Sequence, residues 1–119
     1  VYTRLQAEFG APDLIVAADV FCYLGDLEPL LSRFTHYLAP GGDIIFTVET
    51  LLSDDTSNSK WALGVSGRYA HAPTYVADLA LRLNLSCTQQ VPIVARLENS
   101  KPVQSTLFLL HKAEEAAAQ

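Results

Sequence analysis

The stretch from Asp13 to Glu49 constrains the fold most, because it holds two apolar segments with one amphipathic segment between them. Leu14 to Ala18 is an apolar run without alternation, which is typical of a parallel strand covered on both faces. Ile44 to Val48 is a second, mostly apolar run of strand length. Two buried strands separated by a helix predict a right-handed β-α-β unit.

The segment between these strands has the spacing of a helix with one apolar face. Its apolar positions are Leu27, Leu30, Leu31, Phe34 and Leu38. Asp26 precedes them, and its carboxylate can accept backbone N–H groups that have no partner in the first turn. Pro40, Gly41 and Gly42 follow them, and we expect the helix to end there because proline cannot continue it.

The last third of the chain indicates a second helix followed by a β-hairpin. Pro73 suits the first turn of a helix, and Asn84 can end that helix in the left-handed region. Residues 86–97 and 104–111 have strand character, and the turn sequence Glu-Asn-Ser-Lys-Pro lies between them. We therefore predict one α/β sheet whose last strand runs antiparallel to the two strands of the β-α-β unit.

Composition excludes several classes of function. The chain has 119 residues, enough for one small domain, and a net charge of −5. Without a basic patch, neither nucleic acid nor a membrane surface is expected as a partner. Cys22 and Cys87 have neither metal-ligand nor redox spacing, so we expect no metal site and take a cytoplasmic location as the default.

Four motifs in a fixed order carry a resemblance to a known family: AADVFCYLGDLEPLL, LAPGGDIIFTVET, SGRYAHAPTYV and RLENSKPVQS. Together they resemble class I S-adenosylmethionine-dependent methyltransferases, and more narrowly a group often fused to tetratricopeptide repeats. The resemblance runs from about Tyr2 to Lys112. It implies a Rossmann-like sheet, S-adenosylmethionine as the cofactor, and transfer of a methyl group to an acceptor.

The resemblance covers the carboxyl-terminal half of the family's domain. In this family a glycine-rich cofactor loop follows the first strand, and no such loop occurs in these 119 residues. Gly41 and Gly42 cannot replace it, because they follow a helix and precede a strand. We expect residues 1–119 to form a partial methyltransferase domain that is inactive in isolation.

The same resemblance implies the cofactor-binding residues Glu8, Phe9, Ala18, Asp19, Val20 and Tyr23. The first two match positions that contact adenine. The other four follow the first apolar strand, and ligands of open α/β sheets bind at the carboxyl ends of strands. There Asp19 would receive the cofactor's ammonium group, and Tyr23 or Phe21 would border the sulfonium. The alternatives are a plain loop for Glu8 and Phe9, a turn-capping carboxylate for Asp19, and ordinary packing for the aromatic residues.

Candidate residues for the methyl acceptor lie further along the chain. Glu49 ends the second strand and could orient an amine or act as a base; a solvated strand end is the alternative. In SGRYAH, Arg68 suits a carboxylate or phosphate, and His71 can accept a proton near neutral pH. By resemblance, Arg68 and Tyr69 would bind the acceptor, and His71 or Glu49 would be catalytic. Alternatively, Arg68 pairs with Glu49 or another carboxylate and fixes the loop.

Three functions fit these patterns. The first is methyl transfer to a small-molecule or protein acceptor. The second is a non-catalytic α/β binding domain, and the third is a receiver-like signalling module, although Ala18 stands where a receiver carries its phosphorylated aspartate. We also expect a homodimer through the exposed edge of Leu14–Ala18. The polar segment from Leu51 to Lys60 suits either a lid or an ordinary surface loop.

Overall fold

The predicted β-α-β unit is present. The computed structural model describes residues 10–51, 60–64 and 66–114. Its first elements are β1 (Leu14–Ala17), the short 3-10 helix η1 (Phe21–Tyr23), α2 (Glu28–Tyr37) and β2 (Asp43–Thr50). β1 and β2 are parallel, with Leu14 opposite Asp43 and Ala17 opposite Phe46. The prediction for this part of the chain is therefore confirmed.

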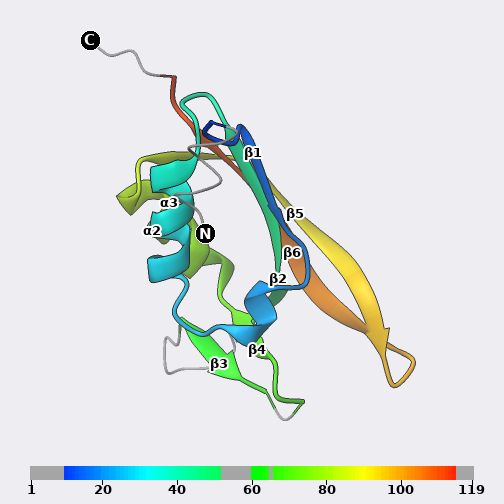
Figure 1. Cartoon of the computed structure of the whole chain (residues 1–119). Helices are drawn as coiled ribbons and strands as arrows, with labels where there is room; N and C mark the ends of the chain where they lie inside the picture. Colours follow the sequence, from blue (N-terminus) through cyan, green and yellow to red (C-terminus); the bar gives the residue numbers. More distant parts are fainter. Residues whose placement is uncertain (1–9, 52–59, 65, 115–119) are drawn as a thin grey trace.

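The remaining elements complete one sheet (Figure 1). They are β3 (Trp61–Leu63), β4 (Tyr69–His71), α3 (Pro73–Arg82), β5 (Leu85–Glu98) and β6 (Lys101–Lys112). The strand order is β3-β4-β2-β6-β5, and β1 also pairs with β2. β6 is antiparallel to β2, as predicted. On the side of β2 away from β6, β1 pairs with the first half of β2 and β4 pairs with its last two residues. The carboxyl end of β1 therefore lies close to β4.

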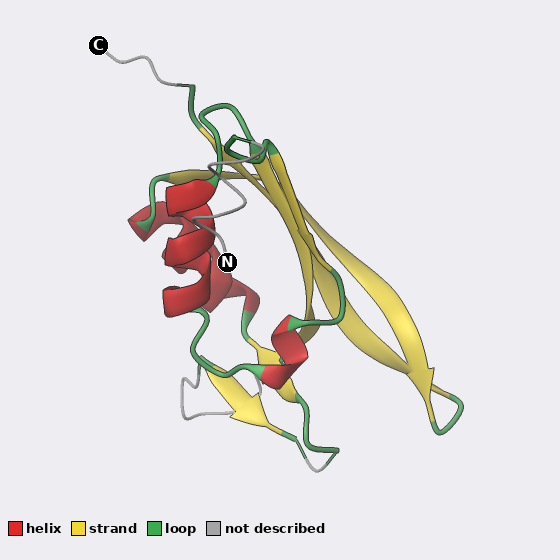
Figure 2. Cartoon of the chain, viewed as in Figure 1, coloured by secondary structure: helices red, strands yellow, loops and turns green. Residues whose placement is uncertain are grey.

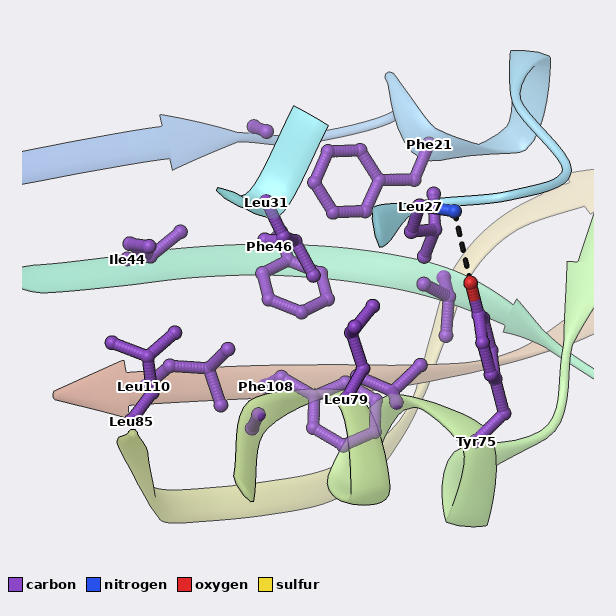
Figure 3. Packing of buried hydrophobic residues seen from close by; sticks show 14 of the residues in the cluster. Phe21, Leu27, Leu31, Ile44, Phe46, Tyr75, Leu79, Leu85, Phe108 and Leu110 are labelled. Atoms are coloured by element: carbon purple, nitrogen blue, oxygen red, sulfur yellow. Dashed lines mark hydrogen bonds between the residues drawn. The ribbon is translucent and has the colours of Figure 1, made fainter. Parts of the chain in front are cut away.

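Both α-helices cover the same face of the sheet (Figure 2), and the core lies between them and that face. Phe46 of β2 is at its centre (Figure 3). Its ring centroid lies 4.7 Å from that of Phe21 and 5.4 Å from that of Phe108. Leu31 of α2 and Leu79 of α3 are fully buried against this cluster. The core therefore joins β1–β2, the β5–β6 hairpin and both helices.

The opposite face of the sheet, called the open face below, has no α-helix over it in the described ranges. On β1 the exposed fractions of Leu14 and Val16 are 55% and 61%. The prediction that this apolar run is covered on both faces is therefore wrong for the described part of the chain. Leu107 and Leu109 of β6, whose side chains are on the open face, are half-buried for the same reason. A strand's apolar run does not specify which elements cover it.

The ends of α2 are stabilised from elsewhere in the chain. Asp26 Oδ1 accepts the backbone N–H of Glu28 at 3.0 Å, as predicted, but Leu27 and not Asp26 is the N-cap residue of α2. At the other end, Lys112 Nζ donates to the carbonyl oxygens of Thr35 at 2.8 Å and Leu38 at 2.7 Å. A cation there complements the negative end of the helix dipole.

Turn residues also act as predicted. Pro73 opens α3, and Asn84 follows the helix with a φ of 62°. Asn99 and Ser100 connect β5 to β6 with φ values of 53° and 64°, the backbone of a two-residue hairpin turn. The β3–β4 hairpin was not predicted, because three-residue strands are too short to show a period of two. No described helix has the length and apolar character needed to cross a membrane.

The outer edge of β1 bears on the expected homodimer. Among the described residues, β1 pairs with β2 alone. The preceding segment that includes Thr3–Phe9 lies outside the described residues, as do residues 52–59 of the expected lid. The homodimer therefore stays a prediction, and light scattering of the chain at micromolar concentration would test it.

Candidate functional site

Two parallel strands bring acidic side chains to one end of the sheet. β1 ends at Ala17, and Asp19 turns the chain with a φ of 57°, a left-handed conformation that asparagine and aspartate tolerate better than most residues. The backbone N–H of Asp19 donates to Oγ1 of Thr47 on β2 at 3.3 Å. Glu49 lies near the carboxyl end of β2, on the same face as Thr47. The turn therefore holds Asp19 beside the end of the neighbouring strand.

Arg68 joins the two carboxylates. Its Nε donates to Glu49 Oε2 at 3.0 Å, and its Nη2 donates to Asp19 Oδ1 at 3.1 Å. Arg68 precedes β4, which pairs with the last two residues of β2. The structure thus brings together three residues that the sequence singled out separately. It also contains the ion pair that was the alternative interpretation of Arg68.

Sequence reasoning missed Arg96, a residue of β5. Its Nη2 lies 2.7 Å from Glu49 Oε2, a charge contact without the angles of a hydrogen bond. Its Nη1 lies 3.7 Å from Asp19 Oδ1, and its Nη2 lies 3.6 Å from Glu98 Oε1. No local pattern connects a residue of β5 with the ends of β1 and β2.

These five residues, Asp19, Glu49, Arg68, Arg96 and Glu98, are called the ion-pair cluster below. The cluster contains three carboxylates and two guanidinium groups. Its members differ in exposure: 16% of the Glu49 side chain is accessible, whereas 61% of the Asp19 side chain is. Glu49 is therefore held inside the cluster, and Asp19 presents its carboxylate to solvent.

The other residues predicted to bind the cofactor are found at the surface beside the cluster. Ala18, Val20 and Tyr23 are exposed. The guanidinium carbon of Arg68 lies 5.3 Å from the centroid of the Tyr23 ring, a cation–π arrangement. Phe21, the alternative neighbour of the sulfonium, is instead fully buried in the core.

Two residues of the predicted set cannot be placed. Glu8 and Phe9, expected to contact adenine, lie outside the described residues.

Tyr69 is part of β4, is half-buried and pairs with Leu63 of β3. Its role toward an acceptor stays a prediction.

His71 is fully buried rather than presented to solvent. Its Nε2 lies 2.8 Å from the carbonyl oxygen of Leu24 and 3.1 Å from that of Gly25, so Nε2 carries the proton and donates. Its Nδ1 is buried and has no hydrogen-bond partner within the described part of the chain. Burial lowers the pKa of His71, so the ring is neutral at neutral pH. Its predicted catalytic role has no support from this placement and stays a prediction.

The contacts of His71 belong to a set that fixes the loop between η1 and α2. A Cβ atom at Gly25 would lie 2.5 Å from Nε1 of Trp61, so the indole packs directly against a residue without a side chain. Tyr75 Oη accepts the backbone N–H of Leu27 at 3.0 Å (Figure 3). The same hydroxyl donates to Asp26 Oδ1 at 3.2 Å. Residues of β3, β4 and α3 therefore hold the loop that follows Tyr23.

Comparison with solved structures gives close matches in fold. A SAM-dependent methyltransferase from Methanosarcina mazei superposes with a TM-score of 0.63 at 12% identity, over 87% of this chain and 60% of that one. The N-methyltransferase NodS from Bradyrhizobium japonicum, in complex with S-adenosyl-L-homocysteine, gives 0.57 at 25% identity, over 86% and 46%. Magnesium protoporphyrin IX methyltransferase from Synechocystis, with S-adenosylhomocysteine bound, gives 0.60 at 10% identity, over 91% and 48%.

These matches show the fold. No family model matches the sequence, and no curated protein matches it. The chain spans between 46% and 60% of the length of the three solved methyltransferases. It has the Rossmann-like fold of class I SAM-dependent methyltransferases, as predicted. The likeness to the group fused to tetratricopeptide repeats stays a prediction.

Proposed function

We propose that this chain is part of a methyltransferase that takes its methyl group from S-adenosylmethionine and transfers it to a small-molecule or protein acceptor. One observation carries the proposal: Asp19 and Glu49 lie side by side at the carboxyl ends of two parallel strands, joined by Arg68. Ligands of open α/β sheets bind at this edge. The fold supports the same conclusion, since the three solved proteins named above that share it are methyltransferases.

The residues at this edge suit the methionine end of S-adenosylmethionine. Asp19 is well exposed and carries a carboxylate that can bind an ammonium group. Tyr23 presents an exposed aromatic ring, and a ring face attracts a cation such as a sulfonium. Asp19, Tyr23 and the backbone of Ala18 and Val20 would therefore hold this end of the cofactor.

The acceptor would then lie next to Glu49. The sulfonium of S-adenosylmethionine makes its methyl carbon electrophilic, so the protein mainly has to hold the acceptor in line at about 3–3.5 Å. Glu49 suits this task, because Arg68 and Arg96 fix its Oε2 while Oε1 has no ion-pair or hydrogen-bond partner among the described residues. Its carboxylate could orient an amine or take a proton from the acceptor.

Binding of S-adenosylhomocysteine measured by calorimetry tests the proposal. We expect the 119-residue chain to bind with a Kd weaker than about 1 mM, or about −4 kcal/mol, because it has no glycine-rich loop. A chain that continues upstream of Val1 into such a loop should bind more tightly. In that longer chain, Asp19→Asn should weaken binding by about tenfold, as expected for loss of one charge-assisted contact.

Asp78→Asn is the matched control, since Asp78 is an exposed aspartate on α3 outside the ion-pair cluster. It should leave the Kd unchanged. The proposal is wrong if a longer chain with the glycine-rich loop fails to bind S-adenosylhomocysteine. Micromolar binding by the 119 residues alone would instead contradict the assignment of the main cofactor contacts to that loop.

A further inference from the structure

A β-bulge in β5 lies close to the ion-pair cluster. Val94 pairs with Gln104 and Arg96 pairs with Val103, so Ala95 is an extra residue without a partner on β6. Side chains along a strand alternate between the two faces of a sheet, and one inserted residue moves every later side chain to the other face. The bulge therefore decides which face of the sheet receives Arg96.

The pairing of β6 with β2 identifies that face. Ser105 of β6 is opposite Glu49, so both side chains are on the open face. Val103, two residues before Ser105, is on the same face by alternation, and it is the partner of Arg96. With regular pairing, Arg96 would be opposite Pro102 and on the face that the helices cover. The bulge thus directs its guanidinium to the face that carries Glu49.

The result is a contact that crosses a strand. β6 lies between β5 and β2, yet Arg96 Nη2 lies 2.7 Å from Glu49 Oε2. Arg68 reaches the same oxygen from the other side of β2 at 3.0 Å. Because only 16% of the Glu49 side chain is exposed, its charge depends on these two cations for compensation.

We propose that Arg96 is a positioning residue of the candidate site: the bulge at Ala95 turns its guanidinium onto the open face, where it holds the Glu49 carboxylate between itself and Arg68. Its part in the reaction rests on the proposed methyltransferase function. By fixing Oε2, Arg96 leaves Oε1 of Glu49 as the oxygen available to an acceptor. It also ties the β5–β6 hairpin to the ends of β1 and β2.

Hydrogen exchange of the Arg68 Nε–H, followed by NMR on the 119-residue chain, tests this role without cofactor or acceptor. Arg96→Gln should make that proton exchange about tenfold faster, because members of one ion-pair network are coupled. In this variant Glu49 would keep only Arg68 of its two guanidinium partners. Arg96→Lys keeps the charge but not the forked guanidinium, so it should restore part of the protection. Deleting Ala95 should have the same effect as Arg96→Gln.

The backbone amides of β5 and β6 serve as the folding check for each variant. The matched control is Arg82→Gln, which removes an exposed pair with Glu28 at 3.4 Å and should not change the exchange of Arg68. Unchanged exchange of the Arg68 Nε–H in Arg96→Gln or in the Ala95 deletion would overturn the inference. Failure of a longer chain to bind S-adenosylhomocysteine would refute the proposed function and leave this measurement unaffected.

Discussion

Leu79→Ala should lower the free energy of unfolding by about 2–5 kcal/mol, because it leaves a cavity in a core that cannot collapse around it. Leu79 is fully buried on α3 and packs in the cluster that includes Phe46 and Phe108. A small domain has about 5–15 kcal/mol of total stability. Urea denaturation followed by circular dichroism should therefore show a much lower midpoint, or a chain that is partly unfolded without denaturant.

Leu81→Ala is the matched control on the same helix. The exposed fraction of Leu81 is 71%, so the same chemical change removes little buried surface. It should alter the free energy of unfolding by less than about 0.5 kcal/mol, as is usual for surface substitutions. Equal losses for the two variants would contradict the placement of α3 against the sheet.

His71→Leu should lower the free energy of unfolding by about 1–3 kcal/mol at pH 7.5, because the carbonyl oxygen of Leu24 would lose its buried donor. His71→Gln should cost less, since a glutamine amide can still donate to that oxygen. Both losses can be measured from urea midpoints. If His71→Leu lowers the free energy of unfolding no more than the same substitution of the exposed His36, the hydrogen bond from His71 to Leu24 does not stabilise the fold.

The same residue makes stability depend on pH. Burial lowers the pKa of His71 in the folded chain below its value in the unfolded chain, which is near 6.5. Below that value the unfolded chain takes up the proton more readily, so its relative free energy falls. This contribution to stability should therefore be full above pH 6.5 and should decline as the pH falls below about 6.5. His71→Gln should remove this part of the decline, whereas His36→Gln should keep it.

Local signals in the sequence determined the elements and their order. The apolar runs around Leu14 and Ile44, the proline at position 73 and the turn at Asn99 each act over a few residues. Such signals depend on backbone preference and on hydrophobic period, and both can be read without knowing what lies across the sheet. The β-α-β unit, α3 and the β5–β6 hairpin were predictable for that reason.

The candidate site was predictable in part. Asp19 follows β1 and Glu49 lies near the end of β2, and the carboxyl ends of neighbouring parallel strands meet at one edge, so their proximity follows from the order of elements. The burial of His71 was not predictable in this way. Its partners are backbone carbonyl groups of residues 24 and 25, more than forty positions away, and every residue type offers the same carbonyl group.

By itself, the sequence determined the β-α-β unit, α3 and the β5–β6 hairpin, and it placed Asp19 and Glu49 at the carboxyl ends of strands. Only the tertiary structure decided which face of each strand is covered, which is why Val16 is exposed although its neighbours are apolar. It also decided the position of Arg96, because the bulge at Ala95 exists only in the register between β5 and β6. Register and burial are properties of pairs of segments, and a pattern within one segment cannot contain them.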